Sequence, residues 1–200
     1  MALNFPASIV PDSIVWSLKS NTQVNTSPLT GVVQTVELPG TRWMATMTFS
    51  NLDVAEARIM ASFMAQLRGA SGRFYVHDFS HPDPQGAAGG TPINLTAGST
   101  TTVVKSSGWP NNTLVLKEGD YVQFHNYELK LITADVTSDG TGLADLPVEP
   151  PVRGTLTDAQ TITTSNAECL MLLDSDDQAR WESVGNSFQS SFSISCVEAF

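Results

Sequence analysis

Every second residue between Thr41 and Phe49 is apolar, and this alternation is the strongest constraint on the fold. Trp43, Ala45 and Met47 precede Phe49 at intervals of two. Side chains of a strand point alternately to its two faces, so this spacing places all four on one face. A helix would instead require apolar residues three and four positions apart. The segment is therefore predicted to be a strand with one face buried.

Shorter runs of the same character recur along the chain, separated by turn-forming residues. Candidate strands cover residues 14–18, 31–38, 74–76, 167–173 and 187–200, whereas residues 20–30 are expected to be a polar connection. Charged residues make up 15% of the 200 residues and hydrophobic residues 41%, which is too apolar a balance for a disordered chain. These features predict a mostly β protein built as a β-sandwich.

One segment has the period of a helix. Asp53 is a suitable N-cap, and Glu56 three residues later completes a capping-box pattern. The apolar residues that follow form one stripe, which ends in a glycine suited to helix termination: Met60, Phe63, Met64, Leu67 and Gly69. We therefore expect a helix over residues 53–68 that covers one face of the sheet. A second stripe of small or apolar residues is a candidate contact with a neighbouring subunit: Val54, Ala57, Ala61 and Ala65.

Residues 102–157 are expected to form a small β domain inserted into the sandwich. A loop rich in Pro, Gly, Thr and Ser precedes them, and turn signals divide them into short strands. Within the insert, Leu129, Leu131 and Thr133 alternate and are expected on one face. Residues 1–101 and 158–200 then make up the sandwich, and the two ends of the insert are expected to lie close together.

The charge balance argues against a nucleic-acid-binding protein. The chain has 20 acidic and 10 basic residues, and 14 of the acidic ones lie after residue 100. Affinity for DNA and RNA depends mainly on Lys and Arg beside the phosphates. The first ten residues lack the basic start and apolar core of a signal peptide, and no run approaches the roughly 20 apolar residues of a membrane span. We expect synthesis in a cytoplasm and no membrane partner.

No motif of the sequence predicts an active site. The loop of residues 77–83 holds two His and two Asp, which are ligand types for divalent metals, but its prolines favour a solvated loop. Residues 174–177 hold three aspartates without the turn glycine and distal glutamate of a calcium loop. The sequence has no nucleophile elbow, P-loop or dinucleotide-binding motif. We predict no catalytic, cofactor-binding or metal-binding residue, and no enzyme.

The cysteines and two of the tryptophans are expected to be packing residues. Cys169 and Cys196 lie in apolar runs and lack the spacing of a zinc site. Trp109 and Trp181 are of a type that stacks on sugars, but both lie beside turns, where a single tryptophan more often packs internally.

Several stretches of the chain resemble the distal tail proteins of long-tailed bacteriophages. The strand of residues 43–49, the helix ending in Leu67-Arg68-Gly69, and the run Gly72-Arg-Phe-Tyr-Val76 resemble the N-terminal part of that family. The insert resembles a module common in the same tail proteins at residues 117–124, 134–136, 139–140 and 150–153, and the ending at residues 197–200 is similar too. In that family a β-sandwich with one helix forms a hexameric ring at the end of the tail tube.

The resemblance implies a structural virion protein at the phage tail tip. It would be a ring subunit, as a homohexamer, and its partners would be the tail tube protein and the tail-tip hub protein. Two alternatives stay open: the tail tube protein itself, and a carbohydrate-binding tail-tip adhesin. A hydrolase is the least favoured interpretation.

In a ring that surrounds a DNA channel, the excess of acidic residues has a second explanation besides solubility. An acidic wall repels phosphates and lets the duplex slide. We predict that some of the carboxylates after residue 100 line the channel, and that the protein has no measurable affinity for DNA at moderate salt. The candidates include Asp120, Glu128, Asp135, Asp139, Asp145, Glu149, Asp158, Asp174, Asp176 and Asp177.

Overall fold

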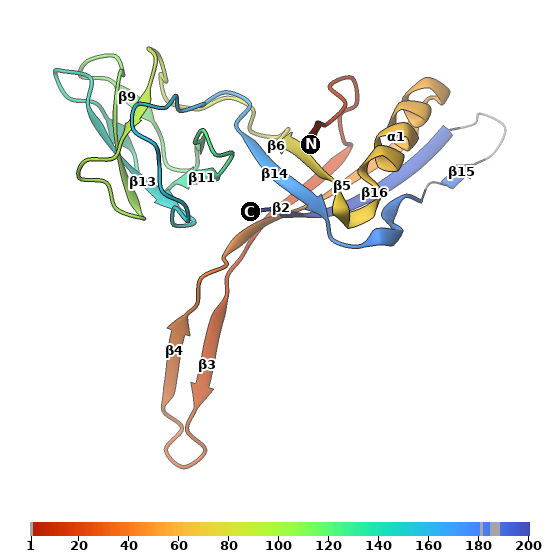
Figure 1. Ribbon diagram of the computed structural model, residues 1–200, viewed down its shortest axis with the longest axis horizontal. Helices are drawn as coiled ribbons and strands as arrows, with labels where there is room; N and C mark the ends of the chain where they lie inside the picture. Colours follow the sequence, from red (N-terminus) through yellow and green to blue (C-terminus); the bar gives the residue numbers. More distant parts are fainter. Residues whose placement is uncertain (1, 181, 185–188) are drawn as a thin grey trace.

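The protein, described here by a computed structural model for residues 2–180, 182–184 and 189–200, consists of two lobes and a projecting arm (Figure 1). In these residues the elements are strands in four sheets, one α-helix and two short 3-10 helices. The prediction of a mostly β protein with one helix is therefore confirmed.

The first lobe is built on a seven-stranded sheet. Its order is β1-β6-β14-β16-β5-β2, with β15 also paired to β16. Only the β1–β6 pair is parallel among the pairings described in this sheet. The strands are β1 (Ala2–Asn4), β2 (Ser13–Lys19), β5 (Arg42–Leu52), β6 (Arg73–His77), β14 (Glu168–Leu173), β15 (Glu182–Val184) and β16 (Gln189–Glu198).

Strand β5 is central to this lobe and has the alternation that the sequence predicts. Trp43, Ala45, Met47 and Phe49 are all buried in the main core. The strand predicted at residues 187–200 is observed as β16, which pairs with β5 and β14. Ser187 and Phe188 of that prediction lie outside the described residues.

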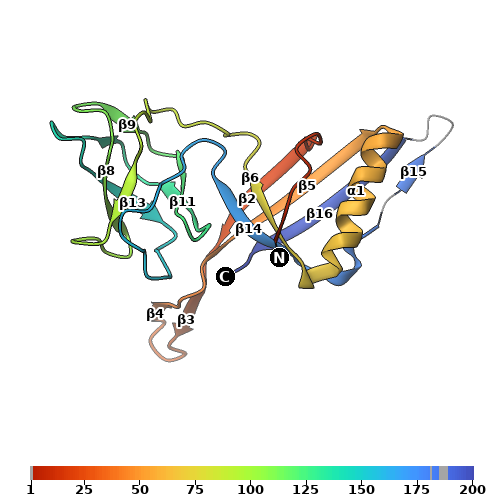
Figure 2. The same cartoon turned by 45° about the horizontal axis from the view of Figure 1, so that its top comes forward.

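The helix α1 (Val54–Leu67) covers one face of the large sheet (Figure 2). Both hydrogen bonds of the predicted capping box are present between Asp53 and Glu56. The four predicted apolar residues are its buried positions, and the helix ends at Arg68, which adopts the left-handed conformation just before Gly69. The short helix η1 (Gly69–Ser71) follows directly.

The second stripe of the helix is only partly available to a neighbour. Ala57 and Ala61 pack against the main core, whereas Val54 and Ala65 are exposed.

The second lobe is a five-stranded sheet, in the order β10-β11-β13-β8-β7, with a two-stranded sheet of β9 and β12 beside it. Its core includes Val104, Phe124 and Ile162. The strands are β7 (Ile93–Leu95), β8 (Val103–Ser107), β9 (Leu114–Leu116), β10 (Tyr121–Gln123), β11 (Leu129–Ile132), β12 (Val136–Thr137) and β13 (Ala144–Glu149). This sheet includes β7, which precedes residue 102, so residues on both sides of the predicted insert contribute to the lobe. The division at 102 and 157 stays a prediction.

Strands β10 and β11 contribute side chains to both cores. Leu129 is buried in the main core, and Tyr121 and Leu131 pack against that core from the same face. Val122 and Ile132 point the other way, into the core of the second lobe. Leu129 and Leu131 therefore share a face as predicted, while Thr133 lies beyond the end of β11 and is exposed.

The arm is a hairpin of β3 (Thr22–Thr26) and β4 (Val33–Glu37) that projects away from both lobes (Figure 1). The expectation that residues 20–30 are only a polar connection is wrong, because Thr22–Thr26 pairs with β4 over its whole length. All ten strand residues of the arm are exposed. Since neither face is buried, no hydrophobic alternation marks β3 in the sequence.

Candidate interaction surfaces

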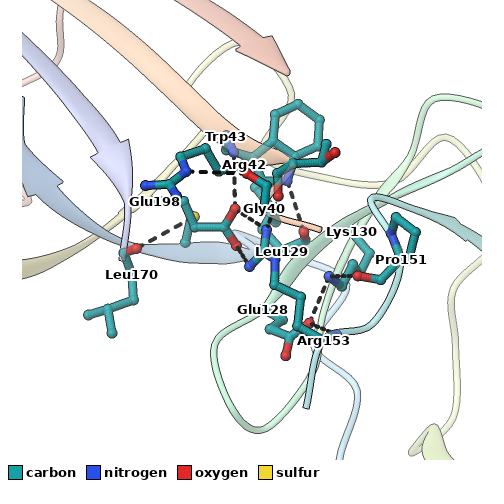
Figure 3. Close-up of polar contacts among 12 residues, drawn as sticks. Gly40, Arg42, Trp43, Glu128, Leu129, Lys130, Pro151, Arg153, Leu170 and Glu198 are labelled. Carbon is teal, nitrogen blue, oxygen red and sulfur yellow. Dashed lines mark hydrogen bonds and ion pairs between the residues drawn. The ribbon is translucent and has the colours of Figure 1, made fainter. Parts of the chain in front are cut away.

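A carboxylate and a guanidinium join the two lobes (Figure 3). The side chain of Glu198, on β16, accepts hydrogen bonds from Arg153 Nη1 at 2.8 Å and Nη2 at 2.6 Å. It also accepts one from the backbone N–H of Trp43 at 3.0 Å, and Arg153 Nη2 donates to the Thr41 carbonyl at 2.7 Å. A bidentate pair of this kind fixes orientation as well as distance. The last strand of the large sheet is thereby attached to the segment that follows β13.

A second ion pair lies next to the first and is more deeply buried. Lys130 has no solvent exposure, and its Nζ lies 2.7 Å from Glu128 Oε2 and donates to the Pro151 carbonyl at 3.1 Å. Burial acts to raise the pKa of Glu128, but Lys130 and the N–H groups of Arg153 and Gly154 outweigh it, so the pKa lies below its ordinary value. Burial lowers the pKa of Lys130, against the opposing effect of Glu128.

Uncharged contacts complete the junction between the lobes. The indole N–H of Trp43 donates to the Leu129 carbonyl at 2.9 Å, and its ring meets Tyr121 edge to face at 5.7 Å. Tyr75 and Tyr127 lie with ring centroids 4.3 Å apart. Burial, helped by Asp78, raises the pKa of Tyr121 to about 12. The junction is therefore packed and hydrogen-bonded as well as ionic.

The arm carries six of the large hydrophobic residues that are exposed in the described part of the chain. Its large aliphatic side chains are mostly more than half exposed, and Leu29 at the tip reaches 94%. The exposed aliphatic residues are Val24, Leu29, Val32, Val33, Val36 and Leu38. No residue from 20 to 36 is ionisable. This absence of charge beside several aliphatic residues is the sequence signal that the prediction of a polar connection missed.

A groove of about 810 Å³ lies at the base of the arm. One wall comes from the arm and the start of β5, and the other from the segment around Pro150–Arg153. Its apolar lining includes Leu38, Pro151, Val152 and Phe200. The guanidiniums of Arg42 and Arg153 lie over the Phe200 ring, 4.8 Å and 4.1 Å from its centroid.

The His and Asp residues of the loop at 77–83 do not come together as a metal site. In the described part of the chain, no group of three or more His, Cys, Asp and Glu is arranged to hold a metal ion. Asp78 is buried, accepts a hydrogen bond from the Ser80 N–H at 2.9 Å, and lies 3.2 Å from His81 Nδ1. Burial lowers the pKa of His77, whose ring lies tilted against that of Phe79, with the centroids 4.4 Å apart. The loop is thus organised by its own hydrogen bonds.

The aspartates of residues 174–177 also bind within the chain. Asp176 accepts a hydrogen bond from the Ala70 N–H at 2.9 Å, and Asp177 accepts one from Ser175 Oγ at 2.7 Å. The Asp176 carboxylate therefore fastens the short helix η2 (Asp176–Gln178) to η1, which follows α1.

The cysteines and Trp109 are internal, as the sequence suggests. Cys169 and Cys196 are free and buried in the main core. Burial raises the pKa of Cys169 well above its ordinary value and that of Cys196 to about 12. Trp109 is buried in the second lobe and donates its indole N–H to Ser106 Oγ at 2.8 Å. Trp181 lies outside the described residues.

Several carboxylates after residue 100 have structural partners. Asp120 is buried and accepts hydrogen bonds from the backbone N–H groups of Gln85 and Lys117, both at 2.8 Å. Asp145 pairs with Lys105 at 2.5 Å on the surface. A role for the remaining acid as a channel lining stays a prediction.

No family model matches the chain, and no curated protein matches it either. No helix of the described residues is long and apolar enough to cross a membrane.

Proposed function

We propose that the chain is a structural subunit of a ring at the distal end of a phage tail tube, where it joins the tube to the tail-tip hub. The observation that carries this proposal is the arm. A two-stranded hairpin is marginally stable in water at best. Among the described residues, β3 and β4 nevertheless pair only with each other, and every residue of the two strands is exposed. Such an element is expected to be completed by another subunit.

The composition of the arm favours assembly over a catalytic or ligand-binding role. An exposed hairpin that carries Val and Leu side chains and a single charged residue is a liability for a protein that stays monomeric. In a subunit of a larger particle the same features provide the contact. The resemblance of the helix and the central strand to distal tail proteins supplies the identity of that particle, with six subunits in the ring.

The test is the native mass of two proteins. The first is the full chain, and the second replaces residues 22–37 by an Asn-Gly turn. The flanking residues are already joined, because Leu38 N–H donates to the Asn21 carbonyl at 2.7 Å. No residue of the deleted segment belongs to either core, so the shortened chain should remain folded.

We expect the full chain to form one closed oligomer, alone at high concentration or on the purified tail tube, and the shortened chain to remain monomeric. Unlimited tubes would favour the tail tube protein instead. A dimer, or a fibre seen by electron microscopy of assembled tails, would contradict the ring.

A further inference from the structure

The arm and the groove at its base are two different surfaces of one chain, and both are apolar. We propose that the tip of the arm, at Leu29, docks into the groove of the next copy of this chain. This inference rests on the proposed ring, for which it supplies the subunit contact.

The charges of the two surfaces favour a second copy as the occupant. The arm has no ionisable residue between Lys19 and Glu37, so it offers nothing for a strongly charged partner to recognise. The charged side chains that line the groove are Glu37, Arg42 and Arg153. Arg153 is already paired with Glu198. The remaining charges, those of the Glu37 carboxylate and the Arg42 guanidinium, balance each other. A neutral groove suits a neutral guest.

Self-association through these surfaces also avoids repulsion between copies. The chain has a net charge of −10, so contacts between charged faces of two copies are unfavourable. The arm and the groove keep that charge away from the contact.

The groove has the lining and the size to receive the tip. Leu29 is 94% exposed, and Pro28 precedes it. The lining of the groove of about 810 Å³ includes proline, valine, leucine and phenylalanine side chains beside threonines and the three charged residues. Burying a leucine side chain stabilises a contact by about 1.5–3 kcal/mol, and the neighbouring aliphatic residues of the arm add to this.

The position of the two surfaces makes the contact head-to-tail. The groove lies at the base of the arm and the tip points away from it (Figure 1), so one chain cannot fill its own groove. A contact between two unlike surfaces generates a ring when the rotation closes. Leu29 lies nine residues before Leu38. At a rise of about 3.4 Å per residue, this part of the arm spans at most about 30 Å, and six such steps give a ring of at most about 30 Å radius.

Disulfide cross-linking tests the contact directly. The double variant Leu29→Cys/Thr102→Cys places one thiol at the tip and one on an exposed threonine of the groove lining. The two native cysteines are buried and do not compete. The matched control is Leu29→Cys/Ser165→Cys, because Ser165 is exposed but does not line the groove.

On mild oxidation at the concentration that gives the oligomer, we expect a ladder of covalent species that ends at the ring size. The control pair should remain uncross-linked. As a second readout, Leu29→Asp should abolish the oligomer without changing the melting temperature, since Leu29 belongs to neither core.

The outcomes separate this contact from the ring itself. A closed oligomer without the ladder, or with equal cross-linking of the control pair, overturns the docking and leaves the ring. Dimers from Leu29→Cys alone mean that tips meet tips, which also overturns it. A ladder that grows without closing supports the docking and contradicts the ring. A chain that is monomeric at every concentration and on the tail tube contradicts both.

Discussion

Lys130 lies at the meeting point of the two lobes with none of its surface exposed, and one carboxylate balances it. Removing one partner of a buried ion pair leaves an uncompensated charge, whereas replacing both by apolar residues is often neutral. Glu128→Gln is therefore expected to lower the free energy of unfolding by about 3–5 kcal/mol.

The double variant Glu128→Gln/Lys130→Met provides the control for that loss. It removes both charges, so it should recover most of the stability lost in the single variant. Urea denaturation of the native protein, this double variant and the single variants Glu128→Gln and Lys130→Met measures the coupling. If the losses of the two single variants simply add up in the double variant, the pair has no net interaction.

The same carboxylate predicts how stability depends on pH. The pKa of Glu128 is lower in the folded protein than in the unfolded chain, where it is about 4.3. Its contribution is therefore fully present above about pH 4.3 and is lost as the pH falls through the folded value. Between pH 5 and pH 3 the native protein should lose more unfolding free energy than Glu128→Gln. Parallel pH profiles of the two proteins would contradict this assignment.

At the scale of elements, α1 depends on a few side chains that touch the core. Phe63 is buried and meets Phe5 and Phe74 edge to face. Phe63→Ala should lower the free energy of unfolding by about 3–5 kcal/mol. Ile59→Ala, on the same helix but 44% exposed, is the matched control and should change stability by less than about 1 kcal/mol. Thermal or urea denaturation tests both, and similar losses would mean that the register of the helix is different.

The sequence predicts α1 and β5 because each has one buried face and, for the helix, a local cap. The pattern at Asp53 and Glu56 lies within four residues, so no tertiary information is needed to find it. Strand β3 is missed for the opposite reason: it exists through pairing with β4, and both of its faces are exposed.

The junction between the lobes could not be found by reading along the chain. Trp43 and Glu198 are 155 residues apart, and Arg153 and Glu198 are 45 apart. Nothing in the spacing of single charged residues indicates that they will meet. The alternation at Leu129 and Leu131 predicts one face of β11, but not that Lys130 is buried on the other.

At the scale of the whole molecule, the lobes are connected by more than their linkers. Deleting residues 102–157 would remove Leu129 from the main core and Arg153 from Glu198, and would leave β7 without β8. The chain leaves and re-enters the first lobe near Pro82 and Asn166, which share a backbone hydrogen bond of 2.5 Å.

Two deletions test this organisation. One replaces residues 102–157 by a short Gly-Ser linker, and the other replaces residues 84–164 in the same way. We expect the first lobe to fold after either deletion, with a lower melting temperature than the full chain because the junction is lost. Removal of residues 84–164 should give the sharper thermal transition, since it takes the whole second sheet. Insoluble protein in both cases would show that the first lobe depends on the second for folding.

The two buried thiols allow the opening of the large sheet to be followed by chemical labelling. Cys169 and Cys196 lie on β14 and β16, and their raised pKa values keep them protonated and unreactive in the folded state. A thiol reagent can modify them only when these strands separate, so the labelling rate reports the free energy of that opening. If the first lobe opens as one unit, both cysteines should react at the same slow rate. Mass spectrometry of partly labelled protein measures this, and early labelling of one cysteine would identify the strand that separates first.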